Sequence, residues 1–127
     1  GSGYDETITS SIFYAYHNEA DNDTTLSYRT ASDQAQGTAF QHLTPYGIGN
    51  GNDSNLSGYL RLFNPSSTTF VKHFISRVNN EYDSSAPYSV DAYVAGYFNT
   101  TSAIDEIQFK GTAGNIDAGD ICLYGIN

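Results

Sequence analysis

The feature of the sequence that most constrains its fold is the alternation of apolar and polar side chains within short segments. In Gly58–Phe63, Leu60 and Leu62 occupy every second position and would share one face of a strand. Tyr59 and Arg61 would share the opposite face. Clusters of Gly, Pro, Asn and Ser separate such segments from one another. The pattern therefore predicts short strands joined by turns.

Eight segments have the composition or the alternation of a strand. They are Ile8–Tyr16, Leu26–Arg29, Thr38–Leu43, Gly58–Phe63, Thr69–Val78, Val90–Asn99, Ile104–Lys110 and Asp120–Tyr124. The only candidate helix is Ala31–Gln36, where Ser32 could cap the first turn. Because Gly37 ends that pattern early, we expect a turn or a short helical loop there.

Turn-forming residues predict where the connections lie. Pro65 in Asn64–Thr68 fixes its own φ and donates no amide hydrogen, which favours a hairpin connection at this point. The stretches 47–55 and 79–87 are expected to be long surface loops. Near the end of the chain, the glycines at 111, 114 and 119 predict tight turns between the last strands.

The same alternation predicts which side chains of the later strands face the core. We expect Ile107 and Phe109 to point inward, and Ile121 and Leu123 to share one face of the last strand. In Thr69–Val78 both faces carry large apolar groups. That strand is therefore expected to lie centrally in the sheet or against a neighbouring subunit.

These elements together predict the fold class. About eight short strands without crossover helices are typical of an all-β protein, here an antiparallel β-sandwich of jelly-roll type. The length of 127 residues fits one hydrophobic core, so we expect residues 1–127 to form a single β-sandwich domain. The chain opens with Gly1, Ser2 and Gly3, and we interpret this end as the cut or truncated end of a longer chain, of which this domain is the C-terminal portion.

The charge balance and the single cysteine exclude several classes of partner. The chain has 14 acidic and 5 basic residues, a net charge of -9, which would repel the phosphates of a nucleic acid. We therefore expect no nucleic-acid partner. No apolar run reaches the roughly 20 residues that cross a bilayer, so we expect no membrane insertion. Cys122 is the only cysteine, which excludes an internal disulfide and a cysteine-based metal cluster.

No catalytic or metal-binding motif is recognisable. Three histidines lie far apart in the sequence, at His17, His42 and His73. They lack the spacing of metal ligands, so we interpret them as polar strand or loop residues. Glu19, Asp21 and Asp23 could offer oxygen ligands to calcium, but the glycine and the terminal glutamate of an EF-hand loop are missing, and we favour a solvated acidic loop. We expect no enzymatic activity, no cofactor and no metal site.

Tyrosine is the most informative excess, with 11 Tyr and no Trp in the chain. A tyrosine packs an apolar ring and offers a hydroxyl, a combination favoured at interfaces and on sugar-stacking surfaces. Tyr46, Tyr82 and Tyr88 lie in or beside predicted loops, so they form the candidate binding surface. The alternative is that most tyrosines fill strand positions, because β propensity alone enriches tyrosine.

The chain closely resembles structural proteins of tailed phages of marine bacteria, such as cyanophages. The similarity covers nearly the whole chain, in the stretches Tyr4–Ser10, Gln36–Phe40, Gly58–Phe74, Ala95–Phe109 and Leu123–Ile126. Its most specific parts are the central Phe-Asn-Pro-Ser-Ser-Thr-Thr at 63–69 and the terminal Leu-Tyr-Gly-Ile at 123–126.

This resemblance implies a virion structural protein: a capsid decoration, a tail component or a fibre component, assembled in the host cytoplasm. Its partners would be other copies of itself and other virion proteins, and no catalytic residues are implied. The alternative is a receptor- or glycan-binding module at a fibre tip that contacts the host surface.

The chain departs from the phage proteins at its start. Such proteins usually have further strand-like sequence before the region equivalent to Gly1. A sandwich without its first strands exposes unpaired edges, which are templates for pairing with another chain. We therefore expect a separate segment of the same precursor to supply these strands, or an adjacent subunit to cover the gap.

Overall fold

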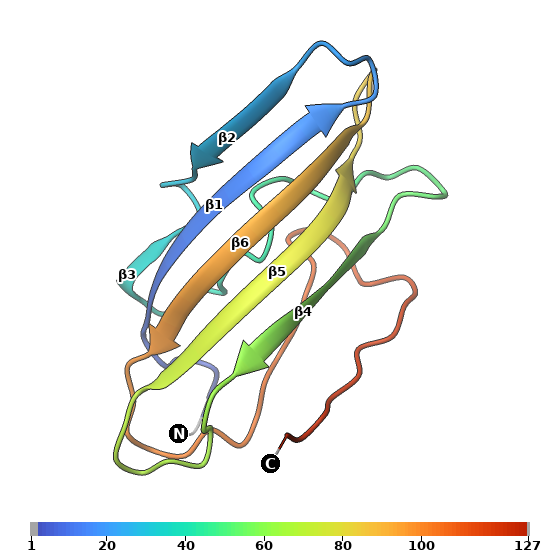
Figure 1. Ribbon diagram of the computed structural model, residues 1–127. Helices are drawn as coiled ribbons and strands as arrows, with labels where there is room; N and C mark the ends of the chain where they lie inside the picture. Colours follow the sequence, from blue (N-terminus) through green and yellow to red (C-terminus); the bar gives the residue numbers. More distant parts are fainter. Residues whose placement is uncertain (1–2, 127) are drawn as a thin grey trace.

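Six strands form a single antiparallel sheet in the computed structural model, which describes residues 3–126 (Figure 1). The strands are β1 (Ile8–Asn18), β2 (Thr24–Tyr28), β3 (Gln34–Gly37), β4 (Leu56–Leu62), β5 (Lys72–Tyr82) and β6 (Tyr88–Phe98). Their order across the sheet is β2-β1-β6-β5-β4, and β3 pairs with β1 on the same side as β2. The sheet therefore ends at β4 on one side and at β2 and β3 on the other.

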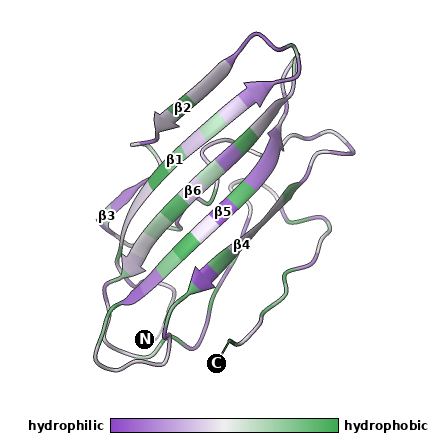
Figure 2. Cartoon of the chain, viewed as in Figure 1, coloured by the Kyte–Doolittle hydropathy of each residue, from purple (hydrophilic) through white to green (hydrophobic). Residues whose placement is uncertain are grey.

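The three central strands set the geometry of the sheet. β1, β6 and β5 each contain 11 residues, and β6 lies between the other two. Every residue of β6 has a partner in both neighbours, from Phe98, opposite Ile8 and Lys72, to Tyr88 at the other end. Because this register is continuous, alternate side chains of all three strands point to the same face. Figure 2 shows hydrophilic residues at both ends of β5 and hydrophobic residues in its middle part.

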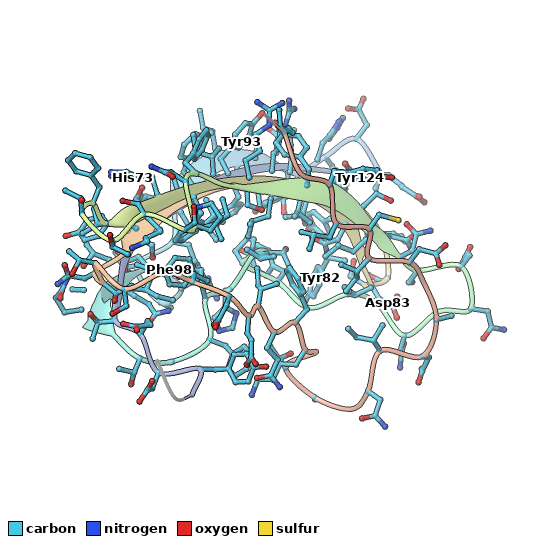
Figure 3. All side chains as sticks on the ribbon, turned by 90° about the horizontal axis from the view of Figure 1, so that it is seen from below. His73, Tyr82, Asp83, Tyr93, Phe98 and Tyr124 are labelled. Carbon is cyan, nitrogen blue, oxygen red and sulfur yellow. The ribbon has the colours of Figure 1, made fainter. Side chains whose placement is uncertain are left out.

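The two faces of the sheet differ in what covers them. Figure 3 shows the irregular segments of the chain beneath one face, on whose side Phe98 and Tyr82 lie; we call it the covered face. His73 and Tyr93 lie on the opposite side, the open face, which the irregular segments leave largely uncovered (Figure 3). The second layer of the molecule is thus made of irregular chain.

The hydrophobic core lies on the covered face. Ile12 in β1, Phe74 in β5 and Val94 in β6 are at most 2% exposed and pack together with Ile8. Leu60, Leu62 and Phe98 are partly buried and pack against this group. Full burial of each such side chain contributes about 1.5–3 kcal/mol, so these few residues account for much of the stability of the sheet.

Buried polar side chains on β5 fasten the irregular layer to the sheet. Lys72 is fully buried, and its Nζ donates a hydrogen bond of 3.1 Å to the carbonyl oxygen of Thr100. The Asn80 side chain accepts a hydrogen bond of 2.6 Å from Thr44 Oγ1 and donates one of 3.2 Å to the carbonyl oxygen of Gly47. Buried polar groups are stable only when they are paired, so these bonds fix where the two covering segments cross β5.

Gly96 in β6 is required by close packing between strands. It lies opposite both Phe74 and Ser10 in the neighbouring strands. A Cβ atom at this position would collide with the carbonyl oxygen of Thr9 and with the side chain of Ser10. Glycine therefore allows β1 and β6 to stay in contact at the point where the Phe74 ring packs.

The prediction of an all-β antiparallel fold is confirmed. Five of the predicted strands correspond to β1, β2, β4, β5 and β6, with ends displaced by a few residues. Leu60 and Leu62 face the core as predicted. The predicted two-faced strand is β5, which lies inside the sheet, and the predicted hairpin connection joins β4 to β5. Asn64 in that connection adopts a φ of 48°, which asparagine tolerates better than most residues.

Three predicted strands are wrong. Thr38–Leu43, Ile104–Lys110 and Asp120–Tyr124 are irregular, so the described residues contain six strands and not about eight. Ile107, which was predicted to point inward, is 42% exposed, and Ile121 and Leu123 of the predicted last strand are 65% and 90% exposed. The alternation in these segments is real, but a strand also needs a neighbour that accepts its backbone hydrogen bonds.

Two connections differ from the prediction as well. The candidate helical turn Ala31–Gln36 contains most of β3, because Gln34–Gly37 pairs with the start of β1. The predicted loop 79–87 is shorter, since β5 continues to Tyr82 and pairs with β6 there. The interpretation of the chain start at Gly1 and Ser2 lies outside the described residues.

A pair of adjacent residues on β5 tests the assignment of the two faces. Phe74 is 1% exposed on the covered face, and Ile75 is 48% exposed on the open face. We expect Phe74→Ala to lower the free energy of unfolding by about 3–5 kcal/mol. The matched variant Ile75→Ala should lower it by only about 1 kcal/mol, because half of that side chain is already in water. Urea denaturation of dilute protein measures both values, and equal losses would contradict the assignment.

Candidate functional site

Five tyrosines gather on the covered side at one end of the sheet. They are Tyr14 and Tyr16 from β1, Tyr46 from the loop after β3, Tyr82 at the end of β5 and Tyr88 at the start of β6. We call this group the tyrosine cluster. The Tyr46 ring lies edge-on to Tyr14 at 5.4 Å between ring centroids and contacts Tyr82 at 5.2 Å, and Tyr82 lies 6.1 Å from Tyr88. The cluster thus brings together Tyr46, Tyr82 and Tyr88, the three residues that the sequence offered as a candidate binding surface.

The hydroxyl groups of the cluster are used within the molecule. The hydroxyls of Tyr14 and Tyr46 share a hydrogen bond of 3.1 Å. Tyr88 donates a hydrogen bond of 2.7 Å to Asp23 Oδ2, and Tyr16 donates a longer one of 3.4 Å to Oδ1 of the same carboxylate. Asp23 therefore links the β1–β2 turn to the tyrosine cluster, which makes this part of the acidic loop a structural element.

These contacts change the acidity of the phenols. The hydrogen bond with Tyr14, and then burial, raise the pKa of Tyr46 from 10.0 to about 12. The hydrogen bond to Asp23 raises the pKa of Tyr88. Burial raises the pKa of Tyr16, with the charge of Asp23 acting in the same direction. All three groups therefore stay protonated at neutral pH.

Most of the cluster is not free to meet a ligand. Tyr14 is 6% exposed, Tyr46 and Tyr88 are partly buried, and Tyr82 is 36% exposed. The guanidinium of Arg29 also lies over the Tyr46 ring, 5.1 Å from its centroid. Beside Tyr88 lies a hollow of about 300 Å³ lined by polar residues from the ends of β1, β5 and β6. A ligand at this end would therefore meet Tyr82 and the polar hollow.

A second group of aromatic residues crosses the open face. The strand register places Tyr59, Arg77, Tyr93, Phe13 and Tyr28 directly opposite one another, one from each of β4, β5, β6, β1 and β2. We call these five residues the open-face row. The rings of Phe13 and Tyr93 stack with centroids 4.8 Å apart and planes 4° apart. Phe13, Tyr28 and Tyr59 are 46%, 48% and 54% exposed. The row therefore leaves three aromatic side chains about half exposed on the open face.

The charged residue in the middle of the row is held in place. Arg77 Nη2 donates a hydrogen bond of 2.8 Å to Asp91 Oδ2, and Arg77 Nε donates one of 3.2 Å to Oδ1. The Arg77 guanidinium also lies over the Tyr93 ring, 4.8 Å from the centroid. The hydrogen bonds from Arg77 lower the pKa of Asp91. A bidentate pair fixes the orientation of both groups, so this part of the open face is rigid.

Neither the histidines nor the acidic loop forms a shared site. His17 and His73 lie near opposite ends of the open face, and His42 is exposed in the loop after β3. His17 Nε2 lies 2.9 Å from Asp21 Oδ1, and both side chains are at least half exposed. Over residues 3–126, no three His, Cys, Asp or Glu side chains gather in an arrangement suited to a metal ion.

An apolar hollow separates the sheet from its irregular cover. Its volume is about 160 Å³, and its wall includes Phe74 and Phe98 from the sheet. Phe40, Ile104 and Phe109 from the covering segments face it from the other side. Protein interiors are normally close-packed, so this hollow shows that the irregular layer fits the sheet incompletely.

The sequence indicated the three loop tyrosines but not the open-face row. Tyr59 was placed correctly on the outer side of its strand, and each other member also occupies an outward position. What the sequence could not show is the register that brings residues from five strands into one line. Sequence patterns define faces, whereas the register depends on pairings between distant segments.

The raised pKa of Tyr46 predicts how stability changes at high pH. An unfolded tyrosine loses its proton near pH 10, whereas folded Tyr46 keeps it to about pH 12. Its stabilising contribution is therefore complete below pH 10 and is lost as the pH rises toward 12. Urea denaturation at several pH values should show this decline, and Tyr46→Phe should make it shallower. Parallel curves for the two proteins would contradict the assignment.

A scan against protein-family models found no matching family, and searches of curated proteins and of solved structures found no match either. Within the part of the chain that the structure describes, no helix has the length and hydropathy needed to cross a bilayer.

Proposed function

We propose that this protein is a structural component of a phage particle, in the capsid decoration, tail or fibre, and that it works through contacts with other protein copies and not through catalysis. The observation that most strongly supports contacts with other protein copies is the surface area that the chain exposes. The chain exposes 8667 Å². A compact monomer of 13.8 kDa would expose about 6,600 Å². The excess of about 2,000 Å² is more than the roughly 800 Å² that a standard interface removes from each partner.

The character of the open face supports a protein partner. Ile75 and Tyr59 are about half exposed there, and neither is part of the core. The charges on this face nearly cancel, because Arg61 and Arg77 are accompanied by Asp91 and Glu81. Two copies with a net charge of -9 each would meet with the least repulsion through such a face.

The virion assignment itself rests on the resemblance of the sequence to phage structural proteins. We propose in addition that the sheet is one half of a jelly-roll-like β-sandwich that becomes complete in the assembly. Two observations support this. The irregular layer leaves an apolar hollow of about 160 Å³ against the sheet. The segments Ile104–Lys110 and Asp120–Tyr124 have the alternation of strands but no partner strand among the described residues.

Self-association tests the assembly role. We expect sedimentation to show concentration-dependent oligomers. Ile75→Glu on the open face should raise the dissociation constant at least tenfold, because it buries a charge in the contact. The matched control Asn50→Glu adds the same charge to an exposed loop and should leave the dissociation constant nearly unchanged. A protein that stays monomeric at every concentration would contradict the proposal.

A second candidate function is recognition of a glycan or receptor at the host surface. It is favoured by the meeting of Tyr46, Tyr82 and Tyr88 at one end of the sheet, where Tyr82 borders solvent and a polar hollow lies beside Tyr88. An aromatic ring next to polar groups is the usual arrangement for stacking on a sugar.

Glycan-array binding tests this second candidate. We expect binding to be lost in Tyr82→Ala and retained in Tyr59→Ala, which removes an exposed tyrosine of the open-face row instead. Loss in Tyr59→Ala alone would place the sugar on the open face, and a blank array would argue against glycan binding.

A further inference from the structure

The segment after the irregular cover exposes its apolar side chains almost completely. We call residues 111–126 the tail. Ile116, Ile121, Leu123, Tyr124 and Ile126 in the tail are between 55% and 90% exposed. A soluble protein rarely leaves such a group of large apolar residues in water unless another surface covers it. The tail is therefore a segment without its packing partner.

The tail is also tethered loosely to the rest of the molecule. A Cβ atom at Gly114, Gly119 or Gly125 would meet nothing within 4 Å, so the chain there crosses open space. Gly114 and Gly119 have φ values of 71° and 130°, which allow sharp changes of direction. Among the described residues, no backbone hydrogen bond outside the strands involves a residue after Ile104, so none involves the tail. Within this part of the chain, no backbone hydrogen bond therefore fixes the tail to the rest of the molecule.

The nearest open edge of the sheet is β4. Its residues pair with β5 on one side, and β4 is the last strand in the order of the sheet. Figure 1 shows the tail passing on the outer side of β4, and Figure 3 shows Tyr124 at the level of the sheet. An edge strand presents unpaired N–H and C=O groups, which are a template for one more strand.

The sequence of the tail matches what this edge requires. If Gly119–Ile126 became extended, Ile121 and Leu123 would point to one face and Cys122 and Tyr124 to the other. Beside β4, the first pair would continue the apolar row of Leu60 and Leu62 on the covered face. The apolar pair would then leave water while its backbone gained the hydrogen bonds it lacks.

We propose that the tail of one copy adds as a strand to the β4 edge of a second copy. This inference rests on the proposed assembly role and names its contact. Within one copy the tail passes beside β4, and among the described residues no backbone hydrogen bond joins the two. The tail therefore does not pair with the β4 edge of its own copy in this structure. A reciprocal exchange between two copies buries two tails and two edges about one twofold axis, a common way for identical chains to associate. The area excess of about 2,000 Å² per chain leaves room for both this contact and the open face.

The native cysteine provides a direct test. Cys122 is exposed in the tail and is the only cysteine of the chain. In the proposed pairing it lies on the same side of the sheet as Ser57 and Arg61 of β4. We would mix the wild type with Ser57→Cys/Cys122→Ser, or with Arg61→Cys/Cys122→Ser, under mild oxidation. Because each chain then holds one cysteine, a disulfide between position 122 and β4 can form only between two copies.

The matched control uses Thr24→Cys/Cys122→Ser, which places the cysteine on the exposed outer strand β2 at the other side of the sheet. Peptide mass spectrometry of the disulfides gives the result. We expect the disulfide from 122 to position 57 or 61 to be at least tenfold more abundant than the one to position 24. Equal amounts at both edges, or none at β4, would overturn the proposal.

Two further outcomes separate this inference from the assembly role. A monomeric disulfide in Ser57→Cys or Arg61→Cys with Cys122 retained, and no disulfide in the mixtures, would show that the tail closes on its own chain. Oligomers that form without the β4 disulfide would support the assembly role and would contradict the proposed tail contact. We also expect Leu123→Ser to raise the dissociation constant at least tenfold, because Leu123 belongs to the apolar pair in the proposed contact. The control Asp117→Ser should leave the dissociation constant unchanged. Both positions are exposed in the single copy, so neither change should disturb its fold.

Discussion

The rest of the structure depends on the continuous register of β1, β6 and β5. Because every residue of β6 is paired on both sides, the faces of the three strands stay aligned over 11 residues. A shift of β6 by one residue against its neighbours would turn Val94 toward the open face and would bring Tyr93 against the core. The buried core and the exposed aromatic row are thus two results of a single pairing. Gly96 supports this pairing, since a larger residue would push β1 away from β6.

The covered face shows how a sheet can hold a layer that has little regular structure. The apolar contacts there are few, and a hollow remains between Phe74 and the covering segments. Directional bonds supply the missing specificity: Lys72 holds the chain at Thr100, and Asn80 holds it at Thr44. Such bonds contribute modest net stability, but leaving their groups unpaired in the interior would be costly. The irregular layer is therefore fixed at points and loose between them.

The sequence predicted the strands that carry their own alternating or β-branched pattern and missed the one that lacks it. β4 and β5 are neighbours in the chain, so their alternation and the turn-forming Pro65 between them were enough to predict a hairpin. β3 was missed because Gln34–Gly37 has little strand character of its own and is extended only by pairing with β1. The three tyrosines that the sequence offered as a candidate binding surface, Tyr46, Tyr82 and Tyr88, meet in space. Their mutual contacts could not be foreseen, because Tyr46 reaches the sheet through a long irregular loop.

The failed strand predictions and the exposed surface concern the same residues. Asp120–Tyr124 has the alternation of a strand, yet it is irregular and leaves Leu123 90% exposed. Ile104–Lys110 is likewise irregular, and its Ile107 is 42% exposed. Natural sequences tend to agree with their native fold at every level, so an alternating pattern without a buried face supports the contact with a second copy that we propose. Under the assembly that we propose, the pattern describes these segments as they pair in the oligomer, whereas the single chain shows them without a partner strand. Agreement between the misplaced strands and the excess surface is what makes a second copy of the chain the simplest way to complete the fold.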